Sequence, residues 1–304
     1  MNEKYHIAVG IVLYNPNMKR FEKCIENLKK QTSQIFVFDN SEKSIYISDD
    51  SVVYLSEGKN KGIAYALNCI MLEAKNKGFE WVVTMDQDSI IPMGLINEFK
   101  KAIDSHFDLG IICPFVKDKR RPYEDNKSDC SEEFIDFCIT SASCTSVEAW
   151  EKSGRFDEWM FIDLVDNEFC KRIRLSGYKI LRLNKLVLDQ EFGQIIPKNQ
   201  KKQEFWVRLS KLLHNRNIAK FSYKKIVSPL RVYYTNRNII YVNKKMKKYG
   251  HVGYENYNCN GYIGFIISFM IPSILRAQNK KKVIKATVHG IIDGCKAKPS
   301  IWNV

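Results

Sequence analysis

Apolar runs rich in β-branched residues alternate with amphipathic segments through the first 190 residues of the chain. Strand patterns occur at 6–14, 34–40, 51–57 and 79–85. Helix patterns separate them at 18–31 and 63–77, where apolar residues recur every three or four positions. The run HIAVGIVLY at 6–14 is continuous, as in a parallel strand buried on both faces. This order predicts an open, Rossmann-like α/β sheet with helices on its faces.

Strand and helix patterns continue beyond residue 100. Apolar runs at 109–116, 134–143 and 178–190 read as strand regions, and 165–176 reads as a helix. A charged loop is expected at 117–133. In open α/β sheets, ligands bind at the carboxyl ends of the strands, so these ends are where functional residues are expected.

The last third of the chain differs in charge. Residues 1–199 carry 27 Lys+Arg and 31 Asp+Glu, whereas residues 200–304 carry 21 and 3. The whole basic excess behind the net charge of +14 therefore lies after residue 200. Such an asymmetry indicates an anionic partner, either a membrane surface or nucleic acid. We predict one domain at 1–200 and a basic, amphipathic helical appendage at 201–304.

An apolar run at 261–275 stands inside this basic region. It is interrupted by Pro272 and followed by the lysines at 280–282. A spanning helix needs about 20 apolar residues, so this run is short. It is either a buried core helix or a segment in the membrane interface. Because apolar residues are mixed with the basic ones, the pattern favours an anionic lipid surface over nucleic acid.

Composition favours a folded, cytoplasmic protein. The chain is 45% hydrophobic and 27% charged, which argues against disorder. Its N-terminus has only a short apolar run, so we expect no signal peptide. Nine cysteines are scattered without a C-x-x-C pair, as expected of reduced thiols rather than a disulfide framework or a zinc site.

Two carboxylates close the strand pattern that ends near residue 85. Asp86 and Asp88 flank Gln87 directly after a buried-looking run. Like charges this close repel each other, and hard divalent cations prefer carboxylate oxygen. A D-x-D tripeptide is common by chance, but its place after a strand predicts a cation or ribose site.

Polar residues follow other strand ends as well. Asp39 closes the second strand pattern, and it is either part of an Asx turn or an acceptor for the N–H of a pyrimidine base. Asn60 and Gly62 precede a helix, whose N-terminus suits an anion. Asp163, Asp166 and Glu168 cluster at another helix start, where acidic residues are favoured anyway. In a cleft, such a carboxylate can act as a general base.

Taken in order, these motifs form a pattern. They are Tyr14-Asn15-Pro16, Asp39-Asn40, Asn60-x-Gly62-Ile63-Ala64-x-Ala66-x-Asn68, Asp86-Gln87-Asp88-Ser89 and Phe161-Ile162-Asp163-x-x-Asp166-x-Glu168. The pattern resembles an inverting family 2 glycosyltransferase of the GT-A fold, in its bacterial rhamnosyltransferase-like branch. The resemblance covers roughly residues 5–195 and extends more loosely to 231–238. It implies a mixed GT-A sheet flanked by helices.

The resemblance also implies a role for each motif. Asp166 would be the catalytic base. The nucleotide would be bound by Tyr14, Asn15, Asp39, Asn60, Gly62, Asp86 and Gln87. A divalent cation, Mn²⁺ or Mg²⁺, would be held by Asp88 and Asp86. The sugar or the acceptor would lie near Ser141, Ser143, Asp163 and Glu168.

Two positions depart from the family pattern. Relatives commonly carry a histidine metal ligand after the last strand, and Gln190 stands at that place. An amide ligates less well than imidazole, so water, Asp189 or Glu191 could complete the set instead. Ala142 stands where a glycine is frequent.

The predicted activity is transfer of a sugar from a nucleotide sugar to a polyprenyl-diphosphate-linked glycan for a capsule or cell-wall polysaccharide. The resemblance favours dTDP-L-rhamnose as donor, with UDP-hexoses (galactosyl, galactofuranosyl or glucosyl) as the alternative. The enzyme would be cytoplasmic and peripheral on the inner face of the membrane, with no nucleic-acid partner. A nucleotidyltransferase is disfavoured because the turn after the first strand, Tyr14-Asn15-Pro16-Asn17, lacks a Gly-rich loop with Arg and Lys.

Overall fold

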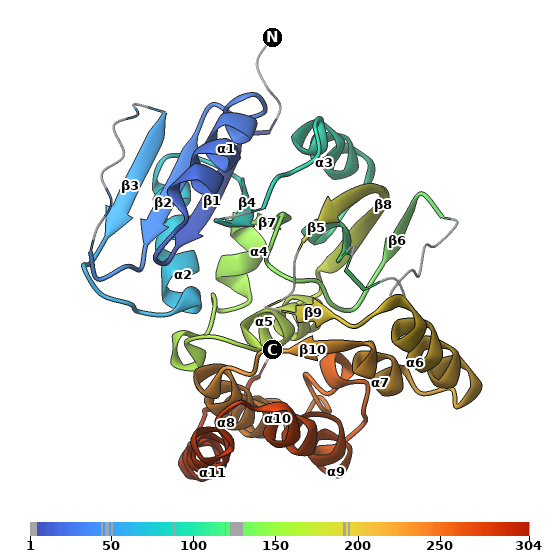
Figure 1. Cartoon of the computed structure of the whole chain (residues 1–304). Coiled ribbons are helices and arrows are strands. Elements are labelled where there is room, and N and C mark those ends of the chain that lie inside the picture. Colours follow the sequence, from blue (N-terminus) through green and yellow to red (C-terminus); the bar gives the residue numbers. More distant parts are fainter. Residues whose placement is uncertain are drawn as a thin grey trace. The chain divides into compact units, whose positions relative to one another are not determined.

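The computed structural model of the chain forms two compact units (Figure 1). It describes residues 5–43, 45, 49, 51–87, 89–118, 120–121, 130–190, 193 and 195–303. The first unit comprises residues 1–117 and 126–190, and the second comprises 118–125 and 191–304. The sequence placed this division after residue 200.

An eight-stranded mixed sheet organises the first unit. Its strands are β1 (Ile7–Leu13), β2 (Ile35–Asp39), β3 (Val52–Ser56), β4 (Trp81–Asp86), β5 (Leu109–Lys117), β6 (Glu132–Phe134), β7 (Ser143–Ser146) and β8 (Lys179–Asp189). Their spatial order is β3-β2-β1-β4-β7-β5-β8-β6. Only β7 and β6 run antiparallel to their neighbours. The other six strands therefore end at one edge of the sheet. The predicted mixed α/β sheet is confirmed.

Helices pack on both faces of this sheet. They are α1 (Met18–Lys29), α2 (Ile63–Asn76), α3 (Leu95–Ser105), α4 (Val147–Lys152) and α5 (Val165–Leu175). Helix α1 begins because the Asn17 side chain caps the backbone N–H of Arg20. The helix packs on the sheet through one apolar face, where Phe21, Cys24 and Leu28 are buried.

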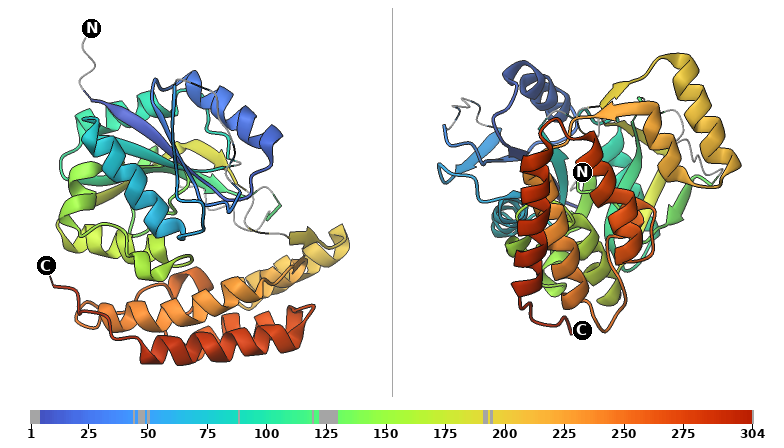
Figure 2. Two further views of the ribbon diagram at one scale, coloured as in Figure 1. Left: turned by 90° about the vertical axis from the view of Figure 1, so that its left-hand side faces the viewer. Right: turned by 60° about the horizontal axis from the view of Figure 1, so that its bottom comes forward.

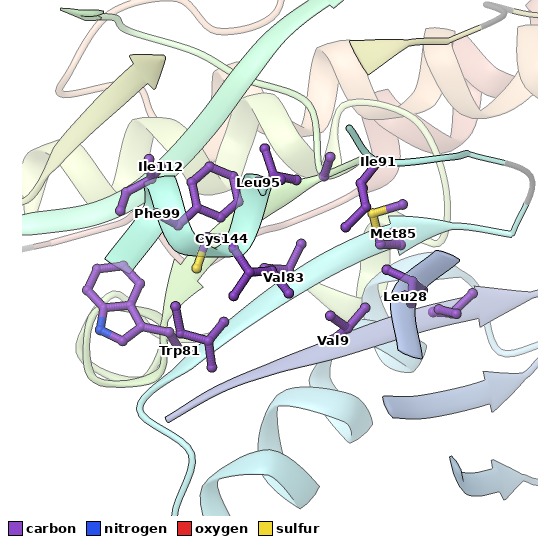
Figure 3. Packing of buried hydrophobic residues seen from close by; sticks show 14 of the residues in the cluster. Val9, Leu28, Trp81, Val83, Met85, Ile91, Leu95, Phe99, Ile112 and Cys144 are labelled. Atoms are coloured by element: carbon purple, nitrogen blue, oxygen red, sulfur yellow. The ribbon is translucent and has the colours of Figure 1, made fainter. Parts of the chain in front are cut away.

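An apolar core lies between the sheet and the α1 and α3 helices. Odd-numbered residues of β1 and β4, such as Val9 and Val83, pack there against Leu28 and Phe99 (Figure 3). The opposite face receives α2. Helix α2 and strand β1 approach each other so closely there that a Cβ on Gly10 would lie 2.3 Å from Ile70.

Two elements of this unit differ from the sequence interpretation. Helix α3 is a regular helix that the sequence patterns did not single out. The run at 134–143 is not a strand: β6 ends at Phe134 and β7 begins at Ser143. Between these strands, side chains form hydrogen bonds with nearby backbone groups. For example, the Ser143 hydroxyl donates to the Ile139 carbonyl. Much of the expected loop at 117–133 lies outside the described residues.

The second unit is mainly helical, as predicted. Its elements are β9 (Ile195–Pro197), α6 (Gln200–Leu212), α7 (Arg216–Ala219), β10 (Tyr223–Lys225), α8 (Pro229–Lys245), α9 (Tyr262–Phe265), α10 (Ile271–Arg276) and α11 (Lys280–Lys296). Strands β9 and β10 form a small antiparallel pair. A short π-helix at Ile266–Met270 joins α9 to α10, so 262–276 is one helical stretch.

Helices α8 and α11 lie side by side (Figure 2). The helices can approach this closely because glycines lie at their contact. A Cβ on Gly290 would lie 2.4 Å from the Tyr233 carbonyl, and a Cβ on Gly294 would lie 2.7 Å from the Arg237 carbonyl. The Lys244 ammonium then donates to carbonyls at the end of α11, including those of Gly294 and Ala297. These contacts fix α11 against α8 along its glycine face.

Candidate functional site

The ends of β1 and β4 are joined by one amide side chain. The Gln87 Oε1 accepts from the Tyr14 backbone N–H at 2.8 Å, and its Nε2 donates to the Tyr14 carbonyl at 3.3 Å. The Tyr14 side chain is 51% exposed at this edge. Asn15 follows at φ +45°, a conformation that asparagine tolerates. Two predicted nucleotide-binding positions, Tyr14 and Gln87, are thus brought together.

Asp39 ends β2 and is fully buried. Its carboxylate accepts from the Ser41 N–H at 2.8 Å, the Ile45 N–H at 3.2 Å and the Tyr54 hydroxyl at 2.6 Å. Burial by itself raises the pKa of Asp39, but the hydrogen bonds from Ser41, Tyr54 and Ile45 outweigh it and hold the pKa below its ordinary value of 3.8. Asp39 therefore carries a stable negative charge.

The donors of Asp39 also bear on its predicted role. A carboxylate has about four acceptor sites, and the Ser41 hydroxyl is a further donor beside the three just described. A pyrimidine N–H would therefore have to displace a protein donor. Sequence reasoning missed Tyr54 and had no signal for it, because the tyrosine lies on a neighbouring strand.

The turn before α2 is held from both sides. Asn40 donates to the Gly62 carbonyl and accepts from the Lys61 N–H, both at 3.1 Å, and the Asn60 side chain accepts from the Gly62 N–H at 2.9 Å. Gly62 has φ +90°, and a Cβ there would lie 2.7 Å from the Phe161 carbonyl. The predicted nucleotide loop thus packs directly on the segment that leads to α5.

Asn68 fixes that same segment from α2. Its side chain donates to the Phe156 carbonyl and Glu158, and accepts from Trp150 and the Phe156 N–H, at 2.8 to 3.0 Å. The sequence motif contained Asn68 but gave it no role. A polar residue on the apolar face of a helix was the available signal.

Asp86 and Gln190 come together across the sheet. The Gln190 Nε2 donates a hydrogen bond to Asp86 Oδ2. The Gln190 Oε1 is buried and has no hydrogen-bond partner among the residues that the structure describes. Such an orphaned oxygen beside a carboxylate fits a hard divalent cation, whose preferred ligands are oxygens. Asp88, the other predicted ligand, and Glu191 lie outside the described residues, while Asp189 ends β8.

No group of three or more His, Cys, Asp or Glu side chains is arranged to hold a metal ion within the ranges that the structure describes. Asp86 and Gln190 could supply two oxygen atoms to a cation, which is fewer than a complete ligand set.

The backbone before α5 is strained. Phe161, Asp163 and Leu164 all have φ between +61° and +67°. Non-glycine residues reach this region at a cost, and such strain gathers at functional sites. It delivers Asp166 to the first turn of α5, where its Oδ1 accepts from the Asn167 N–H at 3.0 Å and its side chain is half-buried.

A cavity of about 10 Å³ lies beside Asp166, lined also by Cys138, Cys170 and Ser143. This space holds at most one water molecule, so it is no sugar pocket. Contact with Cys113 and burial raise the pKa of the Cys138 thiol, and contact with Cys138 and burial raise that of Cys170, which favours the neutral thiol form at both.

Three of the predicted sugar or acceptor residues are buried. The Ser141 hydroxyl lies 3.3 Å from that of Ser89, and the Ser143 hydroxyl donates within its own turn. Glu168 is fully buried and forms a two-pronged ion pair with Arg172, each bond 2.6 Å long. This geometry argues for structural roles at these positions, whereas Asp163 is only partly buried.

Comparison with known proteins identifies the family of the chain. The family model described as Glycosyl transferase family 2 matches residues 8–161. The dTDP-rhamnosyl transferase RfbF of Shigella flexneri is 32% identical over an alignment 198 residues long, which covers 58% of this chain and 65% of that protein. The match thus spans just under two thirds of the relative's length.

The chain is also similar to solved structures. GalNAc-T7, determined with UDP, GalNAc and Mn²⁺, superposes with a TM-score of 0.51 at 11% identity, over 63% of this chain and 45% of that chain. The mannosyltransferase PcManGT from Pyrobaculum calidifontis, in complex with GDP-Man and Mn²⁺, gives 0.48 at 14% identity, over 97% and 87%. At these identities the likeness concerns the fold alone.

Proposed function

The chain belongs to glycosyl transferase family 2, and we propose on this premise that it transfers a sugar from a nucleotide sugar to an acceptor hydroxyl with inversion at the anomeric carbon. The observation that carries the proposal is the register of the sheet. It pairs Leu13 with Asp39 and Val12 with Asp86, so the ends of β1, β2 and β4 meet at one edge. Motifs far apart in sequence thereby come to one edge of the sheet, which supports the proposal that they share a site.

The nucleotide half of the donor would lie along this edge. The exposed ring of Tyr14 offers a surface on which a base can stack. Asn60 and Gly62 lead into α2, a helix of 14 residues whose positive N-terminal end favours the anionic diphosphate. The Ile63 N–H itself donates to the Phe161 carbonyl at 2.7 Å, so this support comes from the helix end as a whole. Asp86, at the end of β4, would face the ribose or the cation.

A divalent cation, Mn²⁺ or Mg²⁺, held by Asp86 and Asp88, would offset the charge that grows on the departing diphosphate. The orphaned Gln190 Oε1 supports this assignment as a further oxygen ligand. Because a nucleoside diphosphate is already a stable anion, the leaving group needs no proton from a protein acid.

Asp166 is proposed as the general base. Its carboxylate keeps contact with solvent while its backbone is fixed by the strained turn before α5. It would remove the proton of the acceptor hydroxyl as that oxygen attacks the anomeric carbon. A single in-line displacement inverts the configuration there. Asp163 is proposed to contact the sugar or the acceptor.

We propose dTDP-L-rhamnose as the donor, supported by the identity with the Shigella flexneri dTDP-rhamnosyl transferase. A UDP-hexose, with galactosyl, galactofuranosyl or glucosyl as the sugar, is the alternative. The proposed acceptor is a polyprenyl-diphosphate-linked glycan of capsule or cell-wall polysaccharide synthesis. The enzyme would act in the cytoplasm, peripherally on the inner face of the membrane.

The test begins with the donor. A thermal-shift screen of dTDP-L-rhamnose and UDP-hexoses, each with Mn²⁺ or Mg²⁺, should show a higher Tm with the cognate donor, because a ligand that binds only the folded state stabilises it. If none of these nucleotide sugars raises the Tm or releases a nucleoside diphosphate, the proposed function is wrong.

The proposed base is tested separately. Asp166→Asn should lower the transfer rate by about 10²- to 10⁴-fold without lowering the donor-induced Tm shift. Asp104→Asn, at an exposed acid on α3, is the matched control and should transfer normally. Transfer by Asp166→Asn at the wild-type rate would rule out Asp166 as the base.

A further inference from the structure

One side of the helical stretch at 262–276 is apolar and open to solvent. Ile263, Ile267, Ile271 and Leu275 recur every four residues and are 76%, 62%, 46% and 66% exposed. The opposite side of the stretch packs inward, where Phe265 is fully buried among Tyr254, Tyr257 and Phe269. The sequence left a buried core helix open as an interpretation, and the structure contradicts it.

Helix α11 has a second exposed apolar stripe. Ile284, Val288 and Ile292 recur every four residues and are 42% to 47% exposed. The buried side of α11 carries Val283, Thr287, Gly290 and Gly294, and the two glycines rest on α8. Both stripes therefore lie on sides of their helices that the second unit itself leaves uncovered. Together these seven residues are called the C-terminal apolar face.

Basic residues accompany this face. Between residues 276 and 298 the basic positions are Arg276, Lys280, Lys281, Lys282, Lys285, Lys296 and Lys298, and Asp293 is the one acidic residue. All six lysines are exposed. Asp293 is engaged within the unit, where it accepts from the Tyr233 hydroxyl at 2.8 Å. At 100° per residue, Lys281 and Lys285 project on the same side of α11 as Ile284 and Val288.

Length decides how such a face can meet a bilayer. By length and composition, Glu255–Arg276 could cross a membrane, and only 11% of its most apolar window is buried. The regular part, however, is the 15-residue stretch at 262–276, because a turn at Glu255–Tyr257 and non-helical residues precede it. That stretch is about 22 Å long, shorter than the hydrocarbon core of about 30 Å.

We propose that the C-terminal apolar face lies in the interfacial region of an anionic lipid bilayer, with the surrounding lysines on the lipid phosphates. The apolar side chains would enter the boundary between headgroups and acyl chains, and the positive charge would supply selectivity for anionic lipid. A nucleic acid would leave the isoleucines in water, so lipid is the better match. This inference deepens the proposed membrane location and is independent of the transfer chemistry.

Vesicle flotation of the full chain tests it directly. The protein should float with vesicles that contain phosphatidylglycerol, should stay in solution with phosphatidylcholine alone, and should be released by high salt. Ile267→Glu combined with Ile271→Glu should lower the partition coefficient about tenfold or more. Lys281→Glu combined with Lys285→Glu should lower the partition coefficient at least about tenfold, because the loss of each lysine alone lowers it roughly fivefold.

Matched controls come from the first unit. Phe107→Glu changes an apolar residue that is 86% exposed, and Lys23→Glu with Lys30→Glu reverses two exposed charges, one on α1 and one directly after it. Both control variants should float like the wild type. Alkaline carbonate should release the bound protein, whereas a spanning helix would stay with the lipid.

Several results would overturn the inference. These are flotation of the double variants at the wild-type level, equal binding to both kinds of vesicle, or resistance to carbonate. Dissociation of a wild-type dimer by Ile267→Glu in sedimentation velocity would show that the face binds a second copy instead. Tight binding of duplex nucleic acid that needs Lys281 and Lys285 would favour that partner. The donor-induced Tm shift is measured in the same variants. If it persists, the failure of membrane binding leaves the proposed transferase activity untouched.

Discussion

The side-chain amide of Gln190, at the end of β8, donates a hydrogen bond to the carboxylate of Asp86, at the end of β4. The other amide atom, Oε1, is buried without a partner. If this oxygen is a cation ligand, a stronger ligand at the same place should bind the ion more tightly. Gln190→His should therefore lower the Kd for Mn²⁺ about tenfold, as measured by calorimetry on the full chain.

The control for this prediction is Gln200→His, which adds an imidazole to the exposed start of α6. It should leave the Kd unchanged. Asp86→Asn should weaken Mn²⁺ binding, because it removes a charged ligand. Equal affinity in wild type and Gln190→His would place residue 190 outside the cation shell.

Asp39 should make stability depend on acid. Its pKa in the folded state lies below 3.8, whereas in the unfolded chain it returns to about that value. The ionised carboxylate therefore stabilises the fold fully above pH of about 3.8, and this contribution is lost as pH falls through the lower folded value. Asp39→Asn should cost about 1–3 kcal/mol at pH 7, with the difference from wild type shrinking below pH of about 3.8.

Urea unfolding at a series of pH values measures this difference. The exposed variant Asp104→Asn should track the wild type throughout. A difference between Asp39→Asn and wild type that stays constant down to pH 3 would mean that the charge of Asp39 does not stabilise the fold.

The strand and helix patterns were enough to locate most of the sheet, because β1, β2 and β4 are short apolar runs that are almost wholly buried. Strand β3 is only partly buried and gave the weaker pattern. They could also place Asp39 and Asp86 at one edge, since parallel strands share a direction. The partners of those carboxylates were out of reach. The Tyr54 hydroxyl and the Gln190 amide reach them from other strands, through contacts that no local pattern records.

Helix α3 shows a different limit. Ile96, Phe99 and Ile103 recur at helical spacing, yet the segment follows the D-x-D motif and its Pro92 and Gly94, which suggest a loop. Tertiary packing decides the matter, because these side chains complete the core against β4 and β5. Likewise, Glu168 looks like an exposed acid at a helix start, and only packing shows that it is buried.

Gly62→Ala should damage the turn before α2. The residue has φ +90°, and its new Cβ would lie within 2.8 Å of Phe161 backbone atoms. We expect a loss of about 2 kcal/mol or more in the free energy of unfolding and a weaker donor-induced Tm shift. Gly78→Ala is the control, since its φ of +79° brings the same backbone strain but nothing lies within 4 Å. Equal losses in both variants would mean that contact with Phe161 is irrelevant.

Ala142→Gly should act in the opposite direction. Ala142 is buried at φ +56° just before β7, a backbone conformation that glycine adopts without steric cost. Glycine would relieve about 1–2 kcal/mol of strain and lose about 0.5–1 kcal/mol to chain entropy. We expect a net gain of about 0.5 kcal/mol in urea unfolding. Ala149→Gly, in helix α4, should instead lose stability. A destabilised Ala142→Gly would contradict the strain.

Breaking the Glu168–Arg172 ion pair should lower the free energy of unfolding strongly, whereas replacing both residues with apolar ones should lower it little. Both side chains are at most 1% exposed, so Glu168→Gln leaves a guanidinium charge buried without its counter-ion. We expect a loss of about 3–5 kcal/mol in urea unfolding. Glu168→Leu combined with Arg172→Met should recover most of it, because neither charge then needs solvation. Glu98→Gln breaks the exposed pair with Lys101 and should change stability by less than about 1 kcal/mol. If the double variant were no more stable than Glu168→Gln, the loss would arise from packing rather than from an unpaired charge.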